Sequence, residues 1–106
     1  MRCIFRATFD DIWGYEERVT VWRARNVGEA CGLAEEEGLE YAAGMSDDTI
    51  EIEYLGVAHT CRLYDPPGHG AEVFALMRQS DLDAADYVEQ FFDTGAEIQK
   101  EDPLAR

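Results

Sequence analysis

Hydrophobic and polar residues alternate along two stretches near the start of the chain, a pattern that is typical of β-strands. The first stretch covers residues 3–9 and the second covers residues 17–25. Residues 10–15, which lie between them, include two aspartates and a glycine, and these residue types favour a reversal of the chain. The pattern therefore predicts an N-terminal β-hairpin that turns within residues 10–15.

A helical repeat replaces the alternation over residues 26–43. Asn26 and Glu29 have the spacing of a capping box at its start, and Gly44 provides a stop signal at its end. One side of the helix carries small or apolar residues: Val27, Ala30, Cys31, Ala34, Gly38, Tyr41 and Ala42. Glutamates occupy the opposite side and the flanks. Because most residues on the apolar side are small, we expect the helix to lie close against a sheet.

Alternation returns over residues 49–57, and Gly56 is a candidate for a β-bulge at the end of this stretch. Isoleucine and tyrosine occupy the positions expected to face the core, whereas Glu51 and Glu53 occupy the positions expected to face water. The segment therefore predicts a strand with one buried face and one acidic face.

The rest of the chain predicts two more strands and a second helix. Residues 58–64 are expected to continue as another strand or as the bent end of the strand that precedes them. A loop rich in proline and glycine at residues 65–70 then leads to a short strand at residues 71–78. The helix is expected at residues 80–93, with Ser80 as its N-cap. Its apolar face would be formed by Leu82, Ala85, Val88, Phe91 and Phe92.

Together these elements predict an α+β fold in the order β-β-α-β-β-β-α. The sheet is expected to be mostly antiparallel, with four to five strands and with two helices over one face. The length suits one domain, which we place at residues 1–95, and residues 96–106 are predicted to form a C-terminal tail. The purest apolar run, Val73–Met77, is too short to span a membrane, and no signal-peptide pattern is present. A cytoplasmic location is therefore predicted.

Charge is distributed unevenly along the chain, whose formal net charge is -14. Residues 1–25 contain five arginines and four acidic residues, whereas residues 26–106 contain four basic and nineteen acidic residues. A surface this acidic repels nucleic acids and anionic lipids and attracts basic proteins. An acidic, lysine-poor composition is also expected in a cytoplasm of high salt concentration, where the charge would serve solubility alone.

Three segments carry a family resemblance. They are a strand led by glutamate that runs into an alanine-rich helix at residues 15–42, a strand that ends near Gly-Val within residues 50–65, and a Gly-x-Glu-Val-Phe segment that begins at Gly70. Together they resemble the DUF4288 family, small bacterial domains of unknown function. The resemblance covers residues 3–78 and implies no established activity, so it assigns no catalytic residue.

The sequence carries no recognisable catalytic motif. It lacks the GxSxG, P-loop, GxGxxG and HExxH patterns. His59 and Cys61 lie two positions apart, but no second pair of ligands accompanies them as a zinc site would need. The three cysteines are expected to be small buried residues or incidental ones. We therefore expect no enzyme activity, no metal and no cofactor.

Size and charge together predict a small domain that binds a basic protein. Immunity proteins that neutralise basic toxins, such as nucleases, are the nearest analogy, because charge complementarity gives such pairs fast association. The alternatives are a small-ligand-binding or accessory enzyme domain and a self-associating scaffold such as a homodimer. Nucleic acids and membranes are not expected as partners. The candidate partner-binding residues are Glu36, Glu40, Asp47, Asp48, Glu51, Glu53, Asp83 and Asp86.

Overall fold

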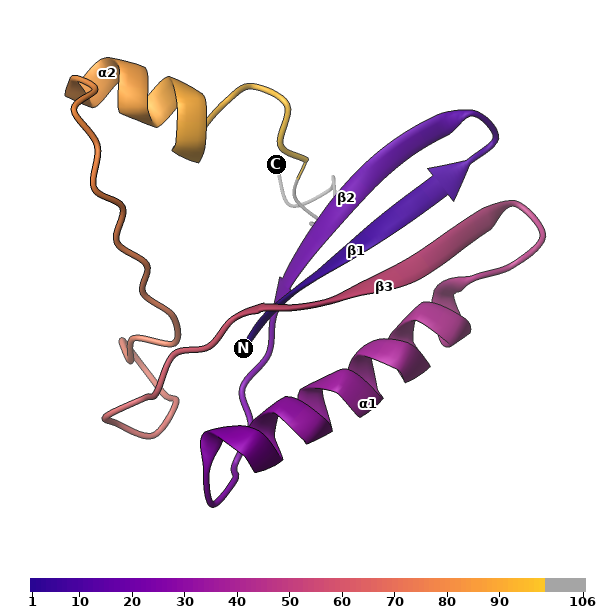
Figure 1. The fold of residues 1–106 in the computed structure, drawn as a ribbon, viewed down its shortest axis with the longest axis horizontal. Helices are drawn as coiled ribbons and strands as arrows, with labels where there is room; N and C mark the ends of the chain where they lie inside the picture. The colour runs from indigo at the N-terminus through magenta and orange to yellow at the C-terminus, as the bar shows by residue number, and fades with distance from the viewer. Residues whose placement is uncertain (99–106) are drawn as a thin grey trace. The chain divides into compact units, whose positions relative to one another are not determined.

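The structure, a computed structural model, describes residues 1–98 except for the side chains of Val57 and Ala58. It consists of two compact units, Met1–Ala75 and a second unit that begins at Leu76 (Figure 1). The predicted domain of residues 1–95 therefore includes parts of both units. Most of the predicted C-terminal tail lies outside the described residues.

The first two strands, β1 (Arg2–Phe9) and β2 (Ile12–Val19), form the predicted hairpin, but its turn is tighter than expected. Only Asp10 and Asp11 separate the two strands. Asp10 has a φ of 53°, a conformation that aspartate tolerates better than most residues. The favoured two-residue hairpin turns have a positive φ at their first central position, so this aspartate suits the tight hairpin.

The predicted boundaries of the reversal, residues 10–15, and of the second strand, residues 17–25, are therefore wrong. Gly14 lies within β2 opposite Ala7, where an ordinary extended conformation is sufficient. Residues 20–25 have left the sheet and connect it to the following helix.

The third strand, β3 (Ile50–His59), pairs antiparallel with β1, which gives the sheet the order β2-β1-β3. The pairing register shifts between Ile4 and Phe5, so that Leu55 is an extra residue in β3. The neighbouring Gly56 has a φ of 133°, which residues with a side chain rarely adopt. The predicted bulge at this glycine is therefore confirmed.

The prediction of four to five strands is wrong, because the described residues contain three. Residues 60–64 and 71–78 form no strand. Alternation is not enough to make a strand, since the backbone N–H and C=O groups also need partners in a ladder. Between these segments, Pro66 and Pro67 lack the N–H groups that a continued ladder would use. The fold is α+β, with the order β-β-α-β-α among the described elements.

The helix α1 (Val27–Met45) begins where the sequence predicts and ends later than expected. The Asn26 side chain accepts a hydrogen bond from the Glu29 nitrogen at 2.8 Å, which confirms the predicted N-cap. The helix end depends on Ser46 rather than on the predicted glycine, because the Ser46 hydroxyl donates to the Ala42 carbonyl at 2.8 Å. The backbone nitrogen of Ser46 donates to the same carbonyl at 3.2 Å, so the last turn of the helix is held by both groups of this residue.

The core of the first unit lies between α1 and one face of the sheet (Figure 1). Phe5 is its largest fully buried side chain, and its ring centroid lies 5.1 Å from that of Tyr41 and 5.4 Å from that of Tyr54. A Cβ atom at Gly38 would lie only 2.7 Å from the Tyr54 ring. Ala34 is also buried, so the close packing predicted from the small residues of the helix is confirmed.

The desolvation of Cys3 and Tyr54 makes the fold sensitive to high pH. Desolvation raises the pKa of Tyr54 from 10.0 to about 12 and raises the pKa of the Cys3 thiol above 9.0. The folded state therefore favours the neutral phenol and the neutral thiol. Their contribution to stability is fully present below the pKa values that the two groups have in the unfolded chain. It is lost as the pH rises through the pKa values that they have in the folded chain. We expect the free energy of unfolding, measured in urea by circular dichroism, to fall as the pH rises from 9.0 to about 12, and to fall less in Tyr54→Phe. An equal fall in both proteins would contradict this assignment.

The second unit contains a short helix, α2 (Ala84–Tyr87), which continues as a π-helical segment, η1 (Val88–Phe92). Its N-cap is Asp83, whose side chain accepts a hydrogen bond from the Asp86 nitrogen at 2.9 Å. The prediction of Ser80 as the N-cap is wrong, because the helix starts later. Asp83 is the residue with an extended backbone directly before the helix. No residue of α2 or η1 is buried, so the predicted apolar face of this helix is not part of a core.

Candidate functional site

Within the first unit, α1 covers one face of the three-stranded sheet, and no helix of that unit covers the opposite face (Figure 1). Successive strand residues point to alternate faces, and paired residues in neighbouring strands share a face. We call the surface opposite α1 the open face; its members are Arg2, Ile4, Arg6, Thr8, Trp13, Tyr15, Glu17, Val19, Glu51, Glu53, Gly56 and His59. Trp13 is 64% exposed and Tyr15 is 60% exposed, so two large aromatic side chains of this face are accessible to solvent.

Phe74 lies at one end of the open face. Its ring centroid is 5.4 Å from the guanidinium carbon of Arg2 and 6.4 Å from the ring centroid of His59. Arg2 and His59 pair with each other at the start of β1, far along the strand from Trp13 and Tyr15. The contact with Phe74 therefore leaves the aromatic part of the open face exposed.

Four side chains from the three strands meet on the open face, and we call them the open-face cluster: Arg6, Trp13, Tyr15 and Glu53. Arg6 donates a hydrogen bond to Glu53 at 2.6 Å, and its guanidinium carbon lies 5.3 Å from the centre of the Trp13 ring. The bond to Glu53, with a smaller contribution from Tyr15, raises the pKa of the Arg6 guanidinium. Because these contacts restrain the arginine and the tryptophan in advance, a partner would lose less conformational entropy on binding them.

Acidic residues gather at the end of the sheet where the β1–β2 hairpin meets the start of β3 (Figure 1). We call this group the acidic sheet end. The hairpin turn contributes Asp10 and Asp11, the connection from α1 contributes Asp47 and Asp48, and β3 contributes Glu51. All five residues are exposed, and none takes part in the ion pairs found among the described residues.

Asp47 has a structural role within the acidic sheet end. Its carboxylate accepts hydrogen bonds from the nitrogen and the hydroxyl of Thr49, both at 2.8 Å, and from the nitrogen of Ile50 at 3.0 Å. These bonds lower the pKa of Asp47 and hold the turn that leads into β3. Its negative charge is therefore fixed in position at the edge of the sheet.

Four of the eight predicted partner-binding residues lie at or beside the open face. Asp47, Asp48 and Glu51 belong to the acidic sheet end, and Glu53 belongs to the open-face cluster. The prediction that Glu51 and Glu53 face water is confirmed, because both are exposed.

The other four predicted residues lie elsewhere. Glu36 and Glu40 are exposed on α1, which covers the opposite face of the sheet. Asp83 and Asp86 belong to the second unit, where Asp83 serves as the cap of α2. The structure therefore does not gather the eight residues into one surface.

Sequence reasoning missed the three aromatic and cationic members of the open-face cluster, Arg6, Trp13 and Tyr15. It placed Trp13 and Tyr15 in a turn because two aspartates and Gly14 surround them. The signal that could have identified them is the group of strand-favouring residues, Ile12, Trp13 and Tyr15, directly after the aspartates. Tryptophan and tyrosine favour strands, and an Asp-Asp pair is long enough for a hairpin turn.

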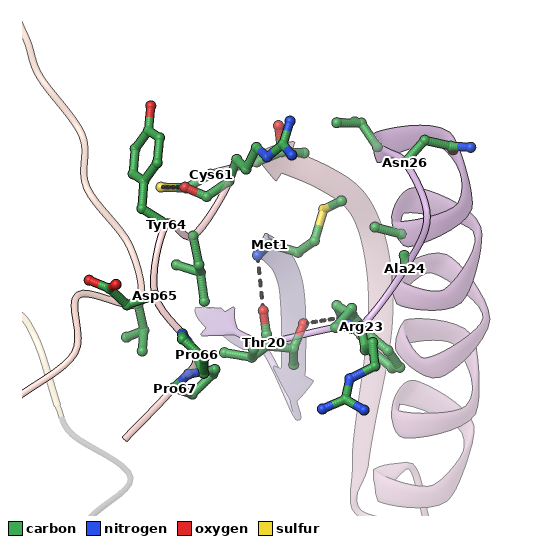
Figure 2. A pocket seen from close by; sticks show the side chains of 18 of the residues that line it. Met1, Thr20, Arg23, Ala24, Asn26, Cys61, Tyr64, Asp65, Pro66 and Pro67 are labelled. Atoms are coloured by element: carbon green, nitrogen blue, oxygen red, sulfur yellow. Dashed lines mark hydrogen bonds between the residues drawn. The ribbon is translucent and has the colours of Figure 1, made fainter. Parts of the chain in front are cut away.

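A pocket of about 720 Å³ opens at the other end of the sheet, beyond the start of β1 and the ends of β2 and β3. Residues 20–27 line one side, residues 60–67 line the other, and Met1 lies between them (Figure 2). The nitrogen of Met1 donates to the carbonyl of Thr20 at 2.9 Å, and the indole of Trp22 donates to the hydroxyl of Thr20 at 2.8 Å. Trp22 also packs against the core, so these contacts anchor the first wall to the sheet.

His59 and Cys61 take part in separate contacts. The ring of His59 faces Phe74, and the Cys61 sulfur lies 3.7 Å from the carbonyl oxygen of Arg62. Among residues 1–98, no group of three or more histidine, cysteine, aspartate or glutamate side chains is placed to hold a metal ion. Cys3 is buried, whereas Cys31 and Cys61 are half-buried, and all three are free thiols.

The chain matches no family model, no curated protein and no solved structure. The resemblance to the DUF4288 family therefore stays a prediction, and function is inferred from the surfaces of this chain. In the part of the chain that the structure describes, no helix combines the length and the apolar character needed to cross a membrane.

Proposed function

We propose that this chain is a non-enzymatic protein-binding domain whose open face binds a basic protein. The open-face cluster is the observation that carries the proposal, because it presents Trp13, Tyr15 and Arg6 together on one exposed surface. These three residue types are the ones most enriched among residues that dominate binding energy at protein interfaces. Each comes from a strand rather than from a loop, so the surface is rigid before a partner arrives.

The acidic sheet end supports a basic partner. Thr8 pairs with Trp13 on one side and with Glu51 on the other, so the aromatic cluster and the acidic residues occupy adjoining parts of the sheet. A protein that covers Trp13 would therefore place its own surface next to uncompensated carboxylates. Lysine and arginine in the partner would be favoured there, and acidic residues would be repelled.

The acids on α1 have a different role in this proposal. Glu36 and Glu40 lie four residues apart on the exposed side of the helix, and like charges at this spacing weaken a helix slightly. They are separated from the open face by the helix and the sheet, so they add to the long-range attraction of a basic protein without contacting it. In this proposal Glu36 and Glu40 are therefore not part of the binding surface, and they contribute only to the negative electrostatic field of the molecule.

An immunity-type protein that neutralises a basic toxin would have these properties, and a cytoplasmic location belongs to this proposal. The net charge of -14 would speed the encounter with such a toxin, while the aromatic cluster would slow its release. Charge that serves solubility alone would not require exposed aromatic residues at one face of the sheet. A self-associating scaffold is the alternative, and the partner-capture experiment distinguishes it from a domain that binds a basic protein.

Trp13→Ala is expected to weaken binding of the partner by at least about 30-fold, which corresponds to about 2 kcal/mol. The partner is first captured from the native cell with the tagged wild-type chain, and its affinity is then measured with purified proteins. The double variant Glu36→Gln/Glu40→Gln is the matched control and should keep its dissociation rate. Because Trp13 is exposed, the variant should retain the unfolding midpoint of the wild type.

Two outcomes would contradict the proposed function. One is capture of nothing but further copies of the chain, which would favour the scaffold. The other is a partner whose affinity is unchanged by Trp13→Ala but is lost in Glu36→Gln/Glu40→Gln, which would place the binding surface on α1.

A further inference from the structure

The pocket beside Met1 has the size of a small-molecule site and lies away from the open-face cluster. Its volume of about 720 Å³ falls in the range of pockets that hold small organic ligands. The pocket lies at the start of β1, whereas Trp13 and Tyr15 lie towards the hairpin at the other end of the sheet. The function proposed for the open face leaves this pocket unused.

The charge of the pocket lining is opposite to that of the molecule. The first unit contains six arginines and fifteen acidic residues, yet its pocket is lined by three arginines and one acid. The arginines are Arg23, Arg25 and Arg62, and the acid is Asp65. In the same unit, the other arginines form ion pairs with glutamates of the sheet or of α1.

Two of the lining arginines have no carboxylate partner among the described ion pairs. Arg25 pairs with Glu29 at 2.7 Å, whereas Arg23 and Arg62 are exposed and take part in no such pair. Arg23 comes from the wall of residues 20–27, and Arg62 comes from the wall of residues 60–67. The two arginines therefore come from opposite walls of the pocket.

The remaining lining supplies apolar surface. Val21 and Trp22 contribute it from the first wall, and Leu63, Pro66 and Pro67 contribute it from the second. The only N–H donor of the Trp22 indole is already bound to Thr20, so the ring offers a ligand its apolar body. The lining therefore combines apolar surface with two arginines that have no carboxylate partner among the described ion pairs.

We infer that this pocket binds a small organic anion, with a carboxylate or phosphate group attached to an apolar or aromatic body. Guanidinium groups recognise both kinds of oxyanion through paired N–H donors. The overall charge of -14 repels anions, so binding depends on the two unpaired arginines. The apolar body adds the contacts that an inorganic ion would lack.

The test uses the full chain and three probes that share one ring: phenyl phosphate, benzoate and phenol. Binding is followed by two-dimensional NMR of the isotopically labelled protein. Phenyl phosphate, benzoate or both should bind saturably and shift the backbone signals of residues 20–27 and 60–67, and their relative affinities distinguish phosphate from carboxylate recognition. Phenol should bind at least about tenfold more weakly, because it lacks the charge.

Arg23→Gln and Arg62→Gln should each weaken binding of the preferred anion by about tenfold. Arg78→Gln removes the same charge from the second unit and should leave that affinity unchanged. Trp13→Ala should also leave it unchanged, so a failure of this inference is distinct from a failure of the proposed function. Absence of saturable binding by both anions, phenol binding equal to theirs, or equal affinities in Arg62→Gln and Arg78→Gln would each overturn the inference.

Discussion

Phe5→Ala is expected to destabilise the first unit by about 3–5 kcal/mol, which is a large part of the total stability of a small domain. Phe5 is 1% exposed, and the other buried hydrophobic residues of the described chain are small: Cys3, Ala34 and Ala42. Removing the phenyl ring would leave a cavity between α1 and the sheet where Tyr41 and Tyr54 now meet it. The free energy of unfolding in urea, followed by circular dichroism, measures the loss.

Phe9→Ala is the matched control for this variant. Phe9 ends the same strand and is 48% exposed, so the same substitution should cost far less than it does at Phe5. If the two variants unfold at the same urea concentration, the core does not lie between α1 and the sheet.

Gly38→Leu is expected to cost about 1–3 kcal/mol through overpacking. A Cβ atom at this position would lie 2.7 Å from the Tyr54 ring, so the ring or the helix must move before any further side-chain atom is added. Tyr54 in turn contacts Phe5, and displacement of its ring would disturb the largest buried side chain. Urea unfolding again measures the effect.

Gly32→Leu provides the control within the same helix. A Cβ atom at Gly32 would meet nothing within 4 Å, so leucine there gains helix propensity without a clash. We expect this variant to be as stable as the wild type or more stable by about 0.5–1 kcal/mol. A loss of stability at Gly32 equal to that at Gly38 would show that the helix is packed on a different side.

The sequence was sufficient to predict the helix and the way it packs. Asn26 with Glu29 identifies the helix start, and small residues such as Ala34 and Gly38 recur at the spacing of one helix side. These signals are local, because a cap and a periodic stripe depend on neighbours within a few residues. For the same reason the bulge at Gly56 could be predicted from its residue type.

The strands beyond β3 could not be predicted correctly, because a strand depends on partners that are distant in sequence. Residues 60–64 alternate as well as many strands do, yet no ladder partner meets them in the described structure. The predicted boundary between the hairpin turn and the second strand was wrong for a related reason. Gly14 is a turn residue by type, and only its pairing with Ala7 shows that it belongs to β2.

The candidate site was predicted in part. The alternation of residues 49–57 is enough to place Glu51 and Glu53 on the solvent face of their strand, and the structure agrees. The open-face cluster was not predicted, because it needs the register that places Arg6 between Tyr15 and Glu53. The predicted partner-binding residues were chosen by their charge and exposure, and only the fold shows that those of α1 lie apart from those of the sheet.

Site-specific photo-cross-linking is the most direct test of the open-face proposal. A photoreactive benzoylphenylalanine is placed either at Tyr15, on the open face, or at Glu36, on the exposed side of α1, and the native cell is irradiated. Both positions are exposed, so neither substitution should disturb the core. The proposal predicts a cross-link from position 15 to a basic protein and none to that protein from position 36. A cross-link to the partner from position 36 alone, or cross-links from position 15 only to further copies of the chain, would contradict it.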